Sequence, residues 1–487
     1  MLIRRTLTAL TLGVALAQAQ KPSATVQQYL KFPSDRLVLR HVRVIDGTGA
    51  PALEDRSVFL ANGKIASISA SSEPAAGAQE IDLTGRTLFP GIVGMHDHLY
   101  YIARPNADSD RRDAQPPLMV PQMAFSSPRM YLAAGVTTIR TTGSVEPYTD
   151  LNLKHQIDAN QLPGPHMDVT GPYLEGTGSP FIQMHQLKDA ADAKATVDFW
   201  AAQGVTSFKA YMFITRAELK AAIDEAHTKG IKVTGHLCSV TYPEAAELGI
   251  DDLEHGFYVN TQLDPGKQPD VCPNTTGGPT LSAMDPDGPD AKALIALLVA
   301  HHVAITSTLP VFETDNGAPP PLQQRVFDAM SPPTREAYLY TRTAEAMRAA
   351  KDPASAARQA KNFQHAQQLE RRFVAAGGLL IAGLDPTGDG HTLPGFGDQR
   401  EIELLVQSGF TPLEAIKIAT FNGAQYLGQQ DKIGSIAAGK NADFVIVKGD
   451  PSQHIEDIEN VEIVFKDGLG FDAPKLMDSI KGRFGQY

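Results

Sequence analysis

The stretch Phe89-Pro90-Gly91-Ile92-Val93-Gly94-Met95-His96-Asp97-His98 says most about the fold, because an apolar run ends in two histidines one residue apart. Side chains alternate along a β-strand, so His96 and His98 point to the same side. Two imidazoles at the end of a buried strand can share one divalent cation. The stretch therefore predicts a buried strand with metal ligands at its carboxyl end.

Further apolar runs follow, and most are separated by stretches with a helical pattern, such as 190–203, 216–229 and 399–408. Near-continuous apolar strands that alternate with helices indicate a parallel sheet in an α/β protein. Eight such strands predict a (β/α)8 TIM barrel over residues 89–429, with an open doubly wound sheet as the alternative. The eight candidate strands are 92–95, 136–140, 167–170, 206–210, 231–234, 252–254, 303–307 and 379–382.

Both ends of the chain have a different residue pattern, with short runs of alternating polar and apolar residues at 37–45, 57–60, 442–447 and 461–465. Turn pairs such as Asn62-Gly63 and Asp467-Gly468 bound these runs, and this combination is typical of antiparallel strands. Neither end has enough strands to be stable alone. We therefore expect residues 20–88 and 430–487 to form one composite β-sandwich domain. The insertions at 262–290 and 316–370 are expected to form loops or lids.

The first 19 residues have the layout of a secretory signal peptide: Arg4-Arg5, an apolar run over 7–16, and Ala17-Gln18-Ala19 before the cleavage point. A buried N-terminal helix is the alternative. The apolar run is too short to span a bilayer. We expect an exported periplasmic or extracellular protein that is not inserted in the membrane after cleavage. Its two cysteines, Cys238 and Cys272, could form a disulfide or stay as free thiols.

The charge balance excludes some partner classes. The formal net charge is −12, and a field of that sign repels phosphate backbones and anionic lipids. Nucleic acid is therefore not an expected partner. The 14 histidines keep metal chemistry open.

Other residues with metal-binding or acid–base chemistry follow later candidate strands. His236, His255 and Asp385 each follow such a strand within three residues, and Lys209 lies inside the apolar setting Val205 to Tyr211. A lysine that points into a barrel is costly as a cation, so it should lose its charge or take a carboxylate-like role. Packing alone does not explain this set at the strand ends.

On these residues the chain resembles the amidohydrolase superfamily. The resemblance rests on Pro-Gly-Ile-Val-x-x-His-x-His at 90–98, on Lys209, His236, His255-Gly256 and Asp385, and on the closing segment 433–443. Within the superfamily the texture is similar to the imidazolonepropionase-related, prolidase-like group, which includes exported carboxypeptidases and ochratoxinase-like amidases. The resemblance implies two divalent metal ions, most often zinc, bridged by a carbamylated Lys209. It also implies that His96, His98 and Asp385 hold the more buried ion, and that His236 and His255 hold the other.

This site predicts a binuclear metal-dependent hydrolase of amide bonds, acting on small N-acyl amino acids or dipeptides. A hydroxide between two cations is a nucleophile at neutral pH, and Asp385 can take its proton and pass it to the leaving amine. Candidate substrate contacts are Tyr211, His391 and Arg140, for which packing or an ion pair is an equal interpretation. The same site would suit a cyclic amide, lactone or ester, and a non-catalytic exported metal- or solute-binding protein is the alternative from another class. The sequence does not determine whether the protein forms a homo-oligomer, which substrate it cleaves or which metal it binds.

Overall fold

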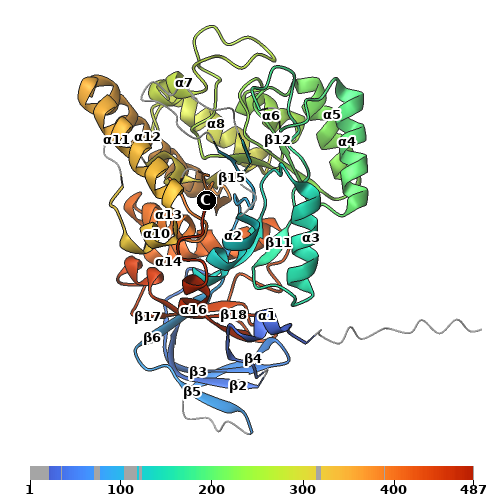
Figure 1. Ribbon diagram of the computed structural model, residues 1–487. Helices are drawn as coiled ribbons and strands as arrows, with labels where there is room; N and C mark the ends of the chain where they lie inside the picture. The colour runs from blue at the N-terminus through green and yellow to red at the C-terminus, as the bar shows by residue number, and fades with distance from the viewer. Residues whose placement is uncertain are drawn as a thin grey trace, which may run out of the picture.

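The computed structural model describes residues 21–34, 36–70, 77–103, 118–119, 123–181, 183–313, 320–388 and 390–485. The fold is mixed α/β. In Figure 1, strands from the two chain ends gather at the bottom, and helices surround a second group of strands above them. The predicted signal peptide, residues 1–19, lies outside the described residues.

All eight strands predicted for the central part of the chain are present, and every pair among them is parallel. One sheet has the order β11-β10-β7, and the other runs from β12 to β16 in sequence order. The strands are β7 (Ile92–Gly94), β10 (Val136–Arg140), β11 (His166–Asp168), β12 (Ser207–Ala210), β13 (Lys232–Gly235), β14 (Asp252–Glu254), β15 (Ala304–Ser307) and β16 (Leu380–Ala382).

Backbone hydrogen bonds also run between these two sheets at both edges. The Gly171 amide donates to the Ser207 carbonyl at 3.0 Å, and at the other edge the Met95 amide donates to the Ala382 carbonyl at 2.8 Å. The close contact between Met95 and Ala382 requires glycine at 383, because a Cβ there would lie 2.5 Å from the backbone nitrogen of His96. The first and last parallel strands are thereby brought together at their carboxyl ends.

Helices follow most of these strands, and their ends carry clear local signals. Thr215 and Glu218 form a reciprocal capping box at the start of α5, and Gly204 ends α4 in the left-handed conformation. The helices after the parallel strands are α2 (Met123–Ala133), α3 (Pro147–Asp158), α4 (Ala190–Gln203), α5 (Arg216–Thr228), α6 (Tyr242–Leu248), α8 (Pro289–Ala300) and α13 (Phe396–Gln407).

The two chain ends join in one nine-stranded sheet. Its order is β1-β19-β18-β17-β6-β2-β3-β4, with β5 paired to β2, and β6 pairs with β17 so that Phe89 lies opposite Val445. Apolar side chains from both ends, among them Leu39 and Phe444, share one buried cluster. The strands are β1 (Leu30–Phe32), β2 (Leu37–Val44), β3 (Leu53–Ala61), β4 (Lys64–Ala70), β5 (Gln79–Asp82), β6 (Arg86–Pro90), β17 (Phe444–Lys448), β18 (Val461–Lys466) and β19 (Leu469–Asp472).

The insertions differ from the expectation of loops or lids. The first contains the short helix α7 (Gly278–Ala283), and the second contains α10 (Gln324–Ala329), α11 (Pro332–Lys351) and α12 (Pro353–Ala375). Because α12 buries Phe363 and Phe373 in the main core, this helix is a structural part of the fold and not a lid. The remaining elements are α1 (Ala24–Gln27), β8 (Ile102–Ala103), β9 (Leu118–Met119), α9 (Leu309–Phe312), α14 (Pro412–Lys417), η2 (Ile418–Asn422), α15 (Gly423–Tyr426), η3 (Ile455–Glu459) and α16 (Ala473–Asp478).

Two further findings concern features left open or predicted from the sequence. Cys238 and Cys272 form a disulfide, which settles which of the two alternatives holds. Within the described ranges, no helix has both the length and the apolar character needed to cross a bilayer.

Candidate active site

His96 and His98 lie just beyond β7, and both imidazoles are oriented by partners on their Nδ1 atoms. His96 Nδ1 is 2.7 Å from Glu254 Oε2, and His98 Nδ1 is 3.1 Å from the Gly143 carbonyl. An acceptor on Nδ1 fixes the proton there and leaves Nε2 as a free lone pair. Both Nε2 atoms lie 3.5 Å from the same atom, Asp385 Oδ1, so the two lone pairs converge on one point.

Asp385, just beyond β16, and His255, just beyond β14, complete this group. His96, His255 and Asp385 offer ligand atoms within 4.8 Å of one another, an arrangement that could hold a metal ion. Both Asp385 (φ 50°) and His255 (φ 68°) have left-handed backbones, which are costly for residues other than glycine and cluster at functional sites. Although burial alone would raise it, His96, His98 and Lys209 together hold the pKa of the Asp385 carboxyl well below its ordinary value.

Lys209 lies in β12 and is 1% exposed. Its Nζ is 3.1 Å from His96 Nε2 and 5.7 Å from the ring centres of Tyr173 and Tyr211. Burial disfavours the charged ammonium and lowers the pKa of Lys209 to about 8. The neutral, nucleophilic form of this amine is therefore more populated near neutral pH than in an ordinary lysine.

His236 follows β13 and joins the histidine group through its ring. The His236 ring lies 4.5 Å from that of His255, which in turn lies 4.6 Å from that of His96. Burial lowers the pKa of His236 to about 3 and the pKa values of His96 and His255 well below their ordinary value. All three rings are thus neutral at physiological pH, which is the form that binds metals. The structure brings together all six predicted metal ligands: His96, His98, Lys209, His236, His255 and Asp385.

Arg140 has a different role from the substrate contact considered from the sequence. Its side chain is 1% exposed, and Nη2 donates at 2.8 Å to both Asp252 and Glu254 of β14 while Nε donates to the Met95 carbonyl. These buried bonds engage the guanidinium and favour the ion-pair interpretation of Arg140 over a contact with a substrate carboxylate. Arg140 instead compensates the charge of Glu254, the carboxylate that orients His96.

Glu254 and Tyr173 are the site residues that the sequence interpretation missed. Glu254 is fully buried in the three-residue strand β14, where a carboxylate must have a partner. That an acid recurs at 252 and 254 with the same parity is the signal that could have identified it. Tyr173 packs near His98 at 6.4 Å and against Tyr211 at 5.0 Å between ring centres, but no motif marks it.

The two remaining candidate substrate contacts lie in different surroundings. Tyr211 lies beside the metal-ligand candidates, with its ring 4.9 Å from that of His236. His391 lines a cavity between α9, α10 and α13, together with Arg325 and Phe396. Tyr211 therefore contacts the histidine group through its ring.

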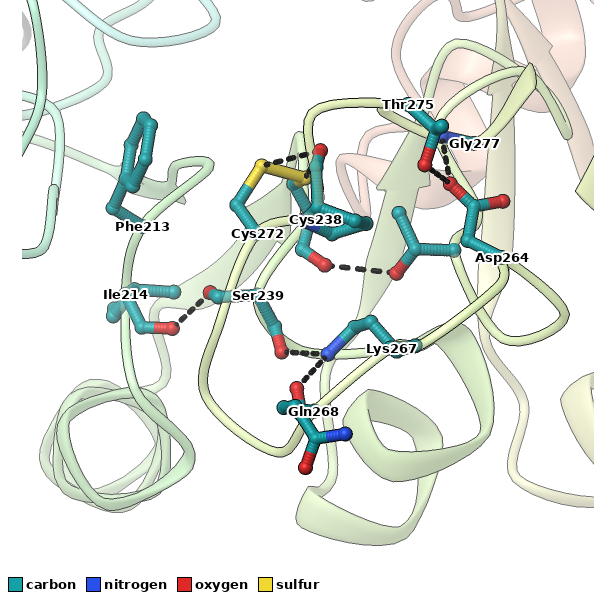
Figure 2. The surroundings of a disulfide bond; sticks show 12 residues. Phe213, Ile214, Cys238, Ser239, Asp264, Lys267, Gln268, Cys272, Thr275 and Gly277 are labelled. Atoms are coloured by element: carbon teal, nitrogen blue, oxygen red, sulfur yellow. Dashed lines mark hydrogen bonds between the residues drawn. A yellow bond between two sulfur atoms is a disulfide. The ribbon is translucent and has the colours of Figure 1, made fainter. Parts of the chain in front are cut away.

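The disulfide holds the loop that follows His236. Figure 2 shows Cys238 joined to Cys272, with Lys267 donating to the Ser239 carbonyl at 2.6 Å. On the far side of this loop, Asp264 accepts hydrogen bonds from Thr275 and from the Gly277 amide. These bonds tie the insertion after β14 to the end of β13 and limit movement of the chain directly beyond His236.

Comparisons with known proteins agree with this geometry. The sequence model of the amidohydrolase family matches residues 87–272 and 341–469. An uncharacterised protein of Mycobacterium tuberculosis is 26% identical over 233 residues, which are 46% of this chain and only 57% of that protein. The imidazolonepropionase of a Geobacillus species is 23% identical over 81% of this chain and 84% of its own length.

Solved structures share the fold across nearly the whole chain. A Xaa-Pro dipeptidase has a TM-score of 0.65 at 19% identity and covers 90% of this chain and 100% of its own. The ochratoxinase of A. niger has a TM-score of 0.64 at 15% identity, with 92% and 99% covered. A bottromycin amidohydrolase has a TM-score of 0.65 at 21% identity, with 92% and 89% covered.

Proposed function

Because this chain belongs to the amidohydrolase family, we propose that it is a binuclear metal-dependent hydrolase that cleaves an amide bond in a small N-acyl amino acid or dipeptide. The observation that carries the proposal is the convergence of the two Nε2 atoms of His96 and His98 on one oxygen of Asp385. Imidazole nitrogens and a carboxylate oxygen at such a point are the donor set of a divalent cation. Similar folds in a dipeptidase and an amidohydrolase support the amide as the bond that is cleaved.

In this proposal His96, His98 and Asp385 hold the more buried ion, and His236 and His255 hold the second. The ions are most simply zinc, because imidazole and carboxylate ligands suit it. Lys209 would be the ligand shared by both sets after conversion to a carbamate, which forms when its neutral amine adds to CO2 and a proton is released. Its lowered pKa supports this step, because only the uncharged amine can attack.

When bound, two such ions would lower the pKa of a water molecule and polarise the scissile carbonyl. The chain's own part is to position the substrate and move the proton. Asp385 is 26% exposed, so its carboxylate can accept a proton from the attacking water and then donate that proton to the leaving amine. Tyr211 is near enough to the histidine group for its hydroxyl to donate to the developing oxyanion.

The wider architecture belongs to the same proposal. We infer that the eight parallel strands close into a (β/α)8 barrel over residues 89–429, which the hydrogen bonds at both sheet edges support. The nine-stranded sheet from residues 20–88 and 430–487 would be the composite β-sandwich domain. A disulfide persists in oxidising compartments, so the Cys238–Cys272 bond supports export after removal of residues 1–19.

The test is a hydrolysis screen of the purified chain with zinc and bicarbonate supplied. The panel holds N-acyl amino acids, Xaa-Pro and other dipeptides, cyclic amides, lactones and esters. Turnover of a linear amide, lost on chelation and regained with zinc, supports the proposal. Turnover restricted to cyclic amides, lactones or esters would show that one of these bonds, and not a linear amide, is the one cleaved. Metal binding without any turnover would indicate an exported binding protein.

A further inference from the structure

We propose a second metal site, separate from the candidate active site, made by His166, Asp443 and Asp467. His166 opens β11, Asp443 directly precedes β17, and Asp467 lies in the turn between β18 and β19. The three residues offer ligand atoms within 4.8 Å of one another. The site therefore lies where the parallel sheets meet the nine-stranded sheet.

Two buried polar atoms that face each other point to a ligand here. Among the described residues, neither His166 Nε2 nor Asp443 Oδ2 has a hydrogen-bond partner, and the Asp443 side chain is 1% exposed. A buried carboxylate oxygen and a buried imidazole nitrogen are costly to leave unsatisfied. The other oxygen of Asp443 accepts from the Asp467 amide at 2.6 Å, so the carboxylate is held in place with Oδ2 toward His166.

The spacing of the three donors fits a small cation. His166 Nε2 is 3.7 Å from Asp443 Oδ2 and 3.2 Å from Asp467 Oδ1. Tetrahedral ligands at about 2.1 Å from a zinc ion lie about 3.4 Å apart, which is within this range. The 3.7 Å separation from Asp443 is too long for an N–H···O hydrogen bond, and 3.2 Å to Asp467 is at the long end of its range.

The charged side chains around the three donors also fit a divalent cation. Lys466 Nζ is 3.1 Å from Asp467 Oδ2, so it neutralises one oxygen and leaves Oδ1 toward His166. Asp158 Oδ1 lies 3.8 Å from His166 Nδ1, on the opposite side of the ring from Nε2. A carboxylate on that side is the usual partner that orients a metal-binding imidazole. One imidazole and two carboxylates would bind a divalent ion of the zinc class and join the two sheet systems.

The experiment uses the full-length protein loaded with Zn²⁺ alone and then passed through metal-free buffer. Wild type and the control His454→Gln, an exposed histidine, should show an anomalous peak at the zinc edge within about 2.2 Å of His166 Nε2. His166→Gln should lack this peak and contain one zinc fewer per chain, while any hydrolytic activity is retained. Asp467→Asn is measured in the same way in case His166→Gln does not fold.

No peak in wild type, or equal zinc content in wild type and both variants, would overturn the site. Because the peaks at His96 and His236 are read from the same map, failure here is distinguishable from failure of the proposed catalytic centre. A peak seen only with excess zinc in the crystal counts against the proposal, because a built site should retain its ion in metal-free buffer.

Discussion

His96 Nδ1 and Glu254 Oε2 are 2.7 Å apart, and both side chains are fully buried. This carboxylate fixes the tautomer that directs His96 Nε2 toward Asp385 and Lys209. Glu254→Gln keeps the shape but removes the negative charge, and partners of this kind contribute about 10–100-fold to metal affinity. We expect zinc affinity to fall by about that factor in a competition titration with a chelator. Glu247→Gln, an exposed control on α6, should bind zinc like wild type, and equal affinity in both variants would contradict the role of Glu254.

Lys209→Ala tests the proposed carbamate bridge. The variant should lose the second metal ion and nearly all turnover, because the remaining histidines no longer share a bridging ligand. Metal analysis and kcat on the best substrate of the screen measure this, with the exposed Lys220→Ala as the control. If Lys209→Ala kept wild-type turnover, another group would have to bridge the ions.

Asp385→Asn separates metal binding from proton transfer. The amide keeps an oxygen toward His96 and His98 but cannot accept the proton, so kcat should fall by about 10²–10⁴-fold while much of the metal remains. Steady-state kinetics alongside metal analysis provide the two readouts, and the exposed Asp431→Asn serves as control. An undiminished kcat would remove Asp385 from the proton pathway.

The Cys238–Cys272 disulfide closes a loop whose ends are 34 positions apart. The chain-entropy model gives a loop of this size about 3–4 kcal/mol of stabilisation. We expect the double variant Cys238→Ser/Cys272→Ser to lose about that much free energy of unfolding in urea. A reducing agent should lower the stability of wild type to the same level and leave the double variant unchanged. If both proteins respond equally to the reductant, the bond does not stabilise the fold.

Asp150 predicts a pH dependence of stability. Burial raises the pKa of this carboxyl from 3.8 to about 7, although the Ser144 hydroxyl donates to it. The folded protein therefore binds this proton more tightly than the unfolded chain, and the free energy of unfolding falls as pH rises from about 4 to about 7. Asp150→Asn removes this titration, so its stability relative to wild type should increase over that range by at most roughly 4 kcal/mol. Urea unfolding at pH 4, 5.5, 7 and 8 measures the difference, and a constant difference would contradict the assignment.

The sequence predicted the parallel strands well because each is a short, nearly continuous apolar run, and most of these runs are separated by stretches with a helical pattern. The six metal-ligand candidates were also found, since each lies in or just beyond such a run. The partners of these residues were harder to predict, because they come from other strands. Arg140 forms ion pairs with Asp252 and Glu254, which lie 112 and 114 positions later, and no residue near Arg140 in the sequence indicates these partners. Tyr173 likewise joins the site only through loop geometry after β11.

The pairing of β6 with β17 has a consequence for how the molecule matures. Arg86 in β6 pairs with Glu462 in β18, 376 positions later, and β6 leads directly into β7, the strand that precedes His96. During synthesis or translocation, β6 can pair early with β2, but its other neighbour, β17, is made only after nearly the whole chain. Contacts of such long sequence separation fold slowly and leave strand edges open in the meantime. A chain shortened before β17 would therefore expose the unpaired edge of β6, and aggregation, rather than a partly active enzyme, is its expected fate.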